Sequence, residues 1–134
     1  MAAKILVVED SLTMRTFLRG ALNGDPRLRD AEVIEAESGF EALRLLPRGP
    51  YQLVISDINM PDINGLELLQ FIRKSEQHKD TPVLLISTQS SGRDRQRGLE
   101  LGANAYLTKP FSAESLCGEA LRHIGGGAQV PSDG

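Results

Sequence analysis

LVISD at residues 53–57, together with INMPDING at residues 58–65, is the stretch that decides the fold. Its three consecutive apolar residues, two of them β-branched, are typical of a strand that is buried on both faces. The strand ends at Asp57, and open α/β sheets bind their ligands at the carboxyl ends of their strands. Pro61, Asn64 and Gly65 then provide turn residues before the next helix. Taken alone, Asp57 could simply cap or solvate a strand end, so the rest of the chain has to decide.

Four other segments repeat this alternation of an apolar run and a helix. They are residues 4–8 (KILVV), 31–36 (AEVIEA), 83–86 (VLLI) and 104–107 (NAYL). Strands that alternate with helices favour parallel pairing through right-handed crossovers, with helices on both faces of the sheet. The sequence therefore predicts a doubly wound α/β fold with a five-stranded parallel sheet, in which the less apolar segment 31–36 lies near an edge.

The helices between these strands have predicted starts, ends and inward faces. Capping residues are expected at Ser11, Ser38, Asn64 and Ser112. Glu41 and Glu67 follow Ser38 and Asn64 at the spacing of a capping box. Gly102 is expected to end the helix at about residues 91–101. Apolar residues recur at helical spacing in the first helix (Leu12, Phe17, Leu18, Ala21, Leu22), the third (Leu66, Leu69, Ile72) and the last (Leu116, Ala120, Leu121, Ile124). The helix at about residues 91–101 differs, because it has little apolar surface and carries Arg93, Arg95 and Arg97.

Composition limits the classes of function. The 134 residues, 40% of them hydrophobic and 25% charged, are typical of one globular domain, which we expect at residues 1–124 with a flexible tail at residues 125–134. A net charge of −3 argues against binding to nucleic acid or to an anionic membrane. No apolar run approaches the roughly 18 residues of a membrane span, and no signal peptide is apparent, so we expect a cytoplasmic protein. Cys117 is expected to pack as a small apolar residue, and His78 and His123 receive no role.

Groups that can do chemistry follow four of the five predicted strands. Glu9 and Asp10 follow the first strand, Asp57 ends the third, Ser87 and Thr88 follow the fourth, and Lys109 follows the fifth. The carboxyl ends of parallel strands lie on one edge of the sheet, so these side chains are expected to converge there.

Electrostatics then predicts a cation at this edge. Two carboxylates about 4 Å apart repel by roughly 4 kcal/mol at an effective dielectric constant near 20. Lys109 cannot neutralise three carboxylates, so either one is protonated or a further cation lies among them. Oxygen ligands without Cys or His select a hard ion, for which Mg²⁺ is the natural choice and Mn²⁺ is tolerated. Such an ion accepts phosphate oxygens, so the site is expected to receive a phosphoryl group.

A carboxylate can act as the nucleophile by forming an aspartyl phosphate. We assign this role to Asp57, which ends the middle strand alone, whereas Glu9 and Asp10 are paired and better suited to hold metal. Lys109 would attract the transferred phosphoryl oxygens, and Ser87 would hydrogen-bond the attached group. The alternatives are a solvated strand-end lysine and a helix-capping hydroxyl.

With these residues in place, the chain resembles the receiver domains of two-component response regulators, closest in form to the single-domain chemotaxis (CheY-type) regulators. The resemblance covers residues 4–124 and rests on VVEDS at 7–11, SDINMP at 56–61 with Gly65, IST at 86–88 and TKPF at 108–111. It implies the flavodoxin-like fold with strand order 2-1-3-4-5. It also implies a phosphoacceptor switch that catalyses only its own phosphorylation and dephosphorylation, with a histidine kinase as phosphodonor.

The resemblance further implies a role for individual residues. Asp57 would take the phosphoryl group, and Asp10, Asp57 and the backbone carbonyl of Asn59 would ligate Mg²⁺, with Glu9 acting through a water molecule. Ser87 and Tyr106 would form a coupled switch pair, and the Lys109–Pro110 peptide would be cis. Thr88 and Gln89 depart from the commoner residues of the family, so together with Asn59 they are expected to tune the lifetime of the phosphate.

The expected output is a change in a partner-binding face. The polar helix with Arg93, Arg95 and Arg97, together with Tyr106, would form this face, although a solvated charged helix and an ordinary half-buried tyrosine are the alternatives. The downstream protein target is not identified by the sequence. We expect a monomer, with a dimer through the same face as the alternative.

Other classes of function remain open at this point. The chain could be a receiver module from a larger hybrid kinase or multidomain regulator. A Mg²⁺-dependent phosphatase of the haloacid-dehalogenase type would want an aspartate at position 59, which is Asn here, and usually carries a cap domain. A flavin or dinucleotide binder would need a glycine-rich turn where Glu9 and Asp10 stand, and these acids would repel its phosphates.

Overall fold

The computed structural model describes residues 3–88 and 92–124. Within these residues, a parallel sheet of five strands has the order β2-β1-β3-β4-β5. The strands are β1 (Lys4–Val8), β2 (Glu32–Ala36), β3 (Leu53–Asp57), β4 (Val83–Ser87) and β5 (Ala105–Thr108). The predicted fold class, strand order and edge position of β2 are therefore confirmed.

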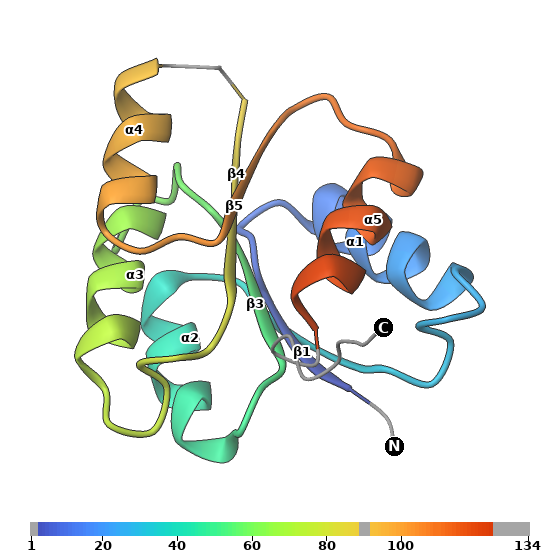
Figure 1. The fold of residues 1–134 in the computed structure, drawn as a ribbon, viewed down its shortest axis with the longest axis horizontal. Coiled ribbons are helices and arrows are strands. Elements are labelled where there is room, and N and C mark those ends of the chain that lie inside the picture. The colour runs from blue at the N-terminus through green and yellow to red at the C-terminus, as the bar shows by residue number, and fades with distance from the viewer. Residues whose placement is uncertain (1–2, 89–91, 125–134) are drawn as a thin grey trace.

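Helices cover both faces of the sheet. They are α1 (Leu12–Gly24), α2 (Gly39–Leu45), the short 3₁₀ helix η1 (Leu46–Arg48), α3 (Gly65–Lys74), α4 (Gly92–Glu100) and α5 (Ala113–His123). Figure 1 shows α1 and α5 on one side of the strands and α2, α3 and α4 on the other. Among the described residues, no helix is long and apolar enough to cross a membrane.

The pairing of the strands determines which residues lie at the carboxyl edge of the sheet. All residues of β3 and β4 are buried, as their apolar runs predict. The strands pair in parallel, with Val8 opposite Ser56, Asp57 opposite Ile86 and Ser87 opposite Thr108. The residues that follow β1, β3, β4 and β5 are thus brought to the same edge.

The inward face of α1 differs from the prediction. Leu18 and Leu22 are buried, but Leu12 and Phe17 are exposed, and Arg15 takes the inward position next to Leu18. Positions 15, 18 and 22 follow the spacing of a single helical face, whereas Phe17 lies about 100° around the helix from Leu18. The prediction is therefore confirmed for Leu18, Ala21 and Leu22 and wrong for Leu12 and Phe17, because counting apolar residues alone does not fix the centre of the face.

Glycine lets α4 pack closely although the helix has little apolar surface. Gly98 is the buried residue of α4, and a Cβ atom there would lie 2.7 Å from Cδ1 of Leu85 in β4. Gly102 follows the helix with φ of 105°, a conformation that glycine adopts without strain, so the predicted helix end is confirmed. Arg93, Arg95 and Arg97 are all exposed on this helix.

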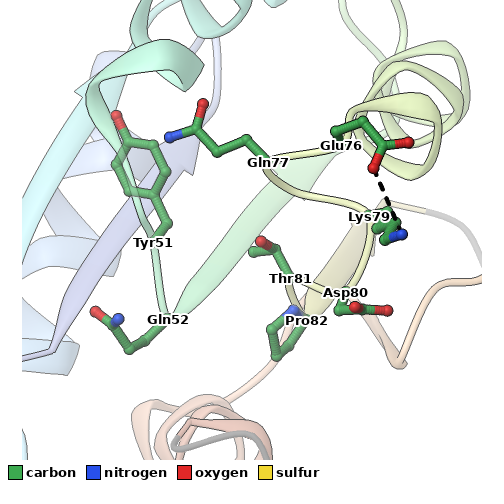
Figure 2. A pocket seen from close by; sticks show the side chains of 8 residues that line it. All are labelled: Tyr51, Gln52, Glu76, Gln77, Lys79, Asp80, Thr81 and Pro82. Carbon is green, nitrogen blue, oxygen red and sulfur yellow. Dashed lines mark ion pairs between the residues drawn. The ribbon is translucent and has the colours of Figure 1, made fainter.

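A hollow of about 380 Å³ lies at the amino ends of β3 and β4, at the edge opposite to Asp57 (Figure 2). Tyr51 and Gln52 line one side, and residues of the segment 76–82 line the other. Glu76 and Lys79 form an exposed ion pair there, with 3.6 Å between their charged atoms. Exposed charges of this kind are well solvated and their attraction is weak.

Candidate functional site

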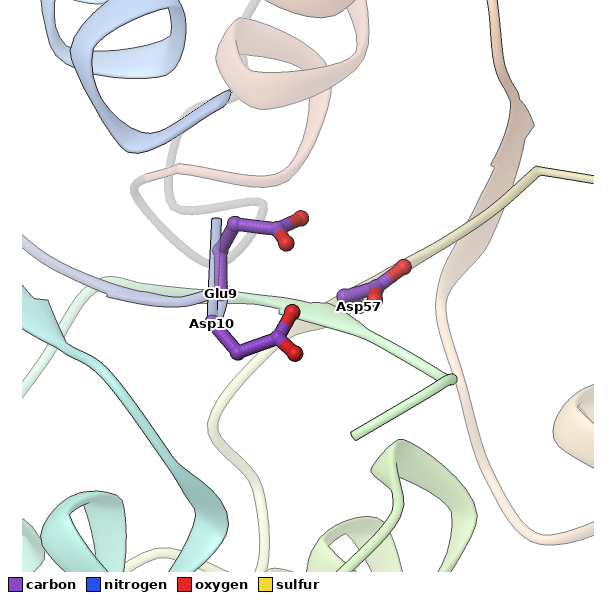
Figure 3. Close-up of side chains that lie close together, drawn as sticks. All are labelled: Glu9, Asp10 and Asp57. Atoms are coloured by element: carbon purple, nitrogen blue, oxygen red, sulfur yellow. The ribbon is translucent and has the colours of Figure 1, made fainter. Parts of the chain in front are cut away.

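Three carboxylates meet at the carboxyl edge of the sheet (Figure 3). Glu9 and Asp10 follow β1, Asp57 ends β3, and one oxygen of each lies within 4.8 Å of the others. Glu9 and Asp57 are buried, with 1% and 4% of their surface exposed, while Asp10 is exposed. The predicted convergence of these side chains is confirmed.

Lys109 contributes the ammonium group of the cluster. Its Nζ atom lies 3.1 Å from Oε1 of Glu9 and 3.3 Å from Oδ1 of Asp57. The peptide bond that joins Lys109 to Pro110 is cis, in agreement with the resemblance. The lysine therefore bridges the acids of two different strands, rather than being solvated at the end of β5.

One oxygen at the centre of the site lacks a hydrogen bond. Among the described residues, Oδ1 of Asp57 is buried without a hydrogen-bond partner, although Lys109 lies within ion-pair distance. Buried polar atoms in native proteins are nearly always hydrogen-bonded or bound to an ion. An oxygen in this state, within a group of carboxylates, fits a divalent cation such as Mg²⁺ or Mn²⁺.

The pKa values of these groups report the same shortage of positive charge. Burial raises the pKa of Glu9, with a further increase from the charge of Asp57. Burial likewise raises the pKa of Asp57, and the nearby Lys109 offsets only part of this effect. For Lys109, burial acts in the opposite direction, but the charges of Asp57 and Glu9 still leave its pKa raised. The folded protein therefore resists full ionisation of both acids until further positive charge is supplied.

The backbone holds the acidic residues in place. Glu9 donates its N–H to the carbonyl of Ala36 at 3.0 Å, and its Oε2 accepts a hydrogen bond from the N–H of Ser11 at 3.1 Å. On the other strand, α3 begins directly against the backbone of Asp57. A Cβ atom on Gly65 would lie 2.5 Å from the carbonyl oxygen of Asp57, so only glycine allows this approach.

The other predicted site residues surround this cluster. Ser87 ends β4 and is buried, while Thr88 is exposed. Asn59 is exposed in the loop between β3 and α3. Gln89 lies outside the described residues.

Tyr106 and the arginines of α4 lie on a different face. Tyr106 is a buried residue of β5 that pairs with Leu85. The guanidinium carbon of Arg95 lies 5.7 Å from the centre of the Tyr106 ring, within the range of a cation–π interaction. The structure thus joins α4 to the predicted switch tyrosine through Arg95.

Two residues near the site were not predicted. Arg15 donates from Nη1 to the carbonyl oxygen of Glu9 at 2.8 Å. Asp62 accepts hydrogen bonds from the backbone N–H groups of Gly39 and Phe40 at 3.2 and 2.9 Å, so it connects the loop after β3 to the start of α2. The available signal for Arg15 was a charged residue at an inward helical position, three residues before Leu18.

Residues without a predicted role lie away from the acids. Cys117 is buried and its Sγ donates to the carbonyl of Ala21 at 3.2 Å, which confirms that it packs in the interior. His78 is buried rather than solvated in its loop, with Nε2 2.7 Å from the carbonyl oxygen of Leu46. His123 lies 3.8 Å from Glu119 at the end of α5.

The chain is similar to known proteins in sequence and in fold. The family model of the response regulator receiver domain matches residues 5–121. A chemotaxis protein CheY homolog of Campylobacter jejuni is 38% identical over 114 residues, which are 84% of this chain and 85% of that protein. The structure of the chemotaxis response regulator CheY4 of Vibrio cholerae is 34% identical, with a TM-score of 0.83, and the match covers 92% of this chain and all of that one. The Mn²⁺-bound form of response regulator Rcp1 is 27% identical, with a TM-score of 0.76, and the match covers 88% of each chain. The chain therefore belongs to the response regulator receiver domain family, as a CheY-like phosphoacceptor of two-component signalling with Glu9, Asp10 and Asp57 in its acidic pocket.

Proposed function

We propose that Asp57 accepts the phosphoryl group from the phosphohistidine of a cognate histidine kinase, in a reaction that requires Mg²⁺. The observation that carries this proposal is the buried Oδ1 of Asp57, which has no hydrogen bond among the described residues and lies beside two further carboxylates and one lysine. A receiver domain implies such a kinase as its phosphodonor.

The residues present fit a hard divalent cation. Asp10, Asp57 and the backbone carbonyl of Asn59 would hold Mg²⁺, and Mn²⁺ would be accepted in its place. Both carboxylate oxygens of Glu9 already have partners, Lys109 and the N–H of Ser11, which favours contact through a water molecule. When bound, the cation neutralises the acids and orients the oxygens of the incoming phosphoryl group.

The side chains of this protein would then carry the transfer. A carboxylate oxygen of Asp57 attacks the phosphorus, an O–P bond forms, and the P–N bond to the donor imidazole breaks. Lys109 is positioned to pair with the phosphoryl oxygens, because its Nζ already lies 3.3 Å from Oδ1 of Asp57. Ser87, at the end of the neighbouring strand, would donate its hydroxyl hydrogen to the attached phosphate.

Incubation with acetyl phosphate tests this proposal without the kinase. We expect intact-protein mass spectrometry to show one phosphate per chain, present only with Mg²⁺ or Mn²⁺ and removed by hydroxylamine, which cleaves acyl phosphates. EDTA should prevent the uptake. A chain that takes up no phosphate, or a phosphate that resists hydroxylamine, would contradict the proposal.

We further propose that the phosphorylated site changes the face formed by α4, β5 and α5, with Arg95 and Tyr106 at its centre. A phosphate adds about −1.5 to −2 of charge and new hydrogen-bond acceptors beside Ser87. Movement of Ser87 toward the phosphate would leave space that the Tyr106 ring can fill by turning inward, and the contact between this ring and Arg95 would change with it. Arg93 and Arg97 would extend this face toward a protein partner. The effects of Asn59, Thr88 and Gln89 on phosphate lifetime stay predictions.

The two tyrosines allow a direct test of this switch. Beryllofluoride with Mg²⁺ mimics the phosphate, and we expect it to shift the NMR signals of the Tyr106 ring and of backbone amides in α4 and β5. Tyr51 provides the internal control, because it lies at the opposite edge of the sheet and its hydroxyl donates to the carbonyl of Leu45. Equal shifts for both tyrosines, or none for Tyr106, would contradict this switch.

A further inference from the structure

Arg15 is a buried charged residue of α1 to which the proposed reaction gives no role. Only 7% of its surface is exposed. Its Nη1 donates to the carbonyl oxygen of Glu9 at 2.8 Å, and its Nε donates to Oε1 of Glu35 in β2 at 3.2 Å. A single guanidinium group therefore joins α1 to β2 and to the acidic edge of the sheet. The planar guanidinium presents Nε and Nη1 as two separate donors in a fixed geometry, which suits these two acceptors.

The carbonyl that Arg15 contacts belongs to the peptide group between Glu9 and Asp10. A peptide group is planar, so a hydrogen bond to its oxygen also fixes the direction in which the Cα atom of Asp10 lies. On the other side of Glu9, its N–H donates to Ala36 at 3.0 Å. Two hydrogen bonds therefore hold the backbone of Glu9, one at its N–H and one at its carbonyl oxygen. Arg15 makes the second of these, at the peptide group next to Asp10.

Asp10 depends on this backbone contact more than its neighbours do. Glu9 and Asp57 are buried and both lie beside Lys109, whereas Asp10 is exposed and the structure gives its carboxylate no hydrogen bond among the described residues. An exposed side chain without such partners takes its average position from its backbone. The direction of the Glu9–Asp10 peptide group therefore decides how well the Asp10 carboxylate is placed beside that of Asp57.

We propose that Arg15 is a positioning residue that raises the affinity of the acidic site for a divalent cation by fixing the Glu9–Asp10 peptide group. This inference rests on the proposed function, because it takes Asp10 as a ligand of the cation. Residues that orient metal ligands through hydrogen bonds typically change metal affinity by roughly 10- to 100-fold when they are replaced.

Arg19 provides a matched control on the same helix. It lies one turn after Arg15, and its Nε donates to the other oxygen of Glu35 at 2.5 Å. Its Nη2 donates to a backbone carbonyl as well, that of Val33 in β2 at 2.9 Å. Arg19 thus shares the residue type, the helix, the acidic partner and the kind of backbone contact, but among the described residues it makes no hydrogen bond or ion pair with Glu9.

The experiment compares Arg15→Met with Arg19→Met by direct titration with Mn²⁺, followed by electron paramagnetic resonance of the free ion. We expect the dissociation constant to rise by about tenfold in Arg15→Met and by less than about twofold in Arg19→Met. The Mg²⁺ concentration for half-maximal phosphorylation by acetyl phosphate should rise in parallel, while the rate at saturating Mg²⁺ stays near that of the unmodified chain. Urea unfolding of both variants separates this effect from a loss of stability, which both are expected to show.

Two results would overturn the inference. One is equal Mn²⁺ affinity in Arg15→Met and Arg19→Met, and the other is a reduced rate at saturating Mg²⁺ with unchanged affinity. If circular dichroism shows that Arg15→Met does not fold, the pair Arg15→Lys and Arg19→Lys replaces it, with a rise of about threefold or more expected only for Arg15→Lys. Failure of the proposed function would appear differently, as an unmodified chain that binds no Mn²⁺ or accepts no phosphate.

Discussion

Replacing Asp57 with asparagine is expected to abolish phosphate uptake and, without divalent cation, to make the protein more stable. The amide has no nucleophilic carboxylate, so uptake from acetyl phosphate should fall below detection by mass spectrometry. The gain in stability has a separate cause, because the amide removes one of three carboxylates that a single lysine cannot neutralise. We expect the free energy of unfolding at pH 7 to rise by about 1–3 kcal/mol, the usual cost of a buried polar group that lacks its partner.

The gain from Asp57→Asn should depend on pH in a defined direction. Burial raises the pKa of Asp57 above its ordinary value of 3.8. A carboxyl group with a raised pKa in the folded state stabilises the fold fully below its unfolded pKa, and this contribution is lost as the pH rises through the folded pKa. The difference in stability between Asp57→Asn and the unmodified chain should therefore be small near pH 4 and grow toward neutral pH. Burial and the charge of Asp57 both raise the pKa of Glu9 above 4.5. Asp57→Asn removes the second cause, so Glu9 should be less destabilising at neutral pH in this variant, which changes the difference in the same direction.

Urea unfolding followed by circular dichroism, in EDTA between pH 4 and pH 7, measures this difference. Asp30→Asn serves as the control, because Asp30 is exposed and its replacement should leave stability within about 0.5 kcal/mol at every pH. Saturating Mg²⁺ should reverse the order of stability, since the cation binds the folded chain more tightly when Asp57 is present. An Asp57→Asn variant that is less stable than the unmodified chain in EDTA would show that the carboxylates are not in electrostatic conflict.

The sequence predicted the parts of the fold that depend on local patterns. Apolar runs predicted the buried strands, and the spacing of Asn64 and Glu67 predicted the capping box that starts α3. The same spacing at Ser38 and Glu41 predicted only one of the two hydrogen bonds of a capping box. Ser38 accepts the N–H of Glu41 as expected, but the Glu41 carboxylate accepts a hydrogen bond from Glu37 instead of from Ser38. A pattern of residue types does not specify which of two adjacent N–H groups a flexible side chain will reach.

The candidate site was predictable because parallel strands bring their carboxyl ends to one edge, so Glu9, Asp10, Asp57 and Lys109 followed from topology alone. The contacts that hold this edge could not be predicted in the same way. Arg15 reaches Glu35, twenty residues away, and Asp62 reaches the start of α2, more than twenty residues before it. Such contacts appear only once the elements are packed.

The family match also removes the phosphatase and flavin-binding alternatives, which the residues themselves made unfavourable.

Replacing Lys109 with methionine is expected to lower the stability of the protein, whereas Asp57→Asn raises it. It should also slow phosphorylation strongly. The lysine lies within 3.3 Å of acids from two strands, and removing it leaves the buried Glu9 and Asp57 without a compensating charge. Breaking a buried ion pair by removing one partner typically costs about 3–5 kcal/mol, so Lys109→Met should be destabilised in EDTA. The double variant with Asp57→Asn should recover part of this loss, because one of the two uncompensated acids is then neutral.

The rate of phosphorylation separates the chemical role of Lys109 from this structural one. A positive group directed at the oxygens of a transferring phosphoryl group is worth roughly 10²–10³ in rate, so we expect uptake from acetyl phosphate to slow by about a hundredfold at saturating Mg²⁺. Mn²⁺ affinity should stay equal or become tighter, because the ammonium group no longer competes for the same carboxylates. Lys79→Met is the control, since Lys79 is exposed and its ion pair is with Glu76 alone among the described residues. A Lys109→Met variant that is phosphorylated at the unmodified rate would assign the lysine to stability only, and the phosphoryl oxygens would then have to be neutralised by the divalent cation alone.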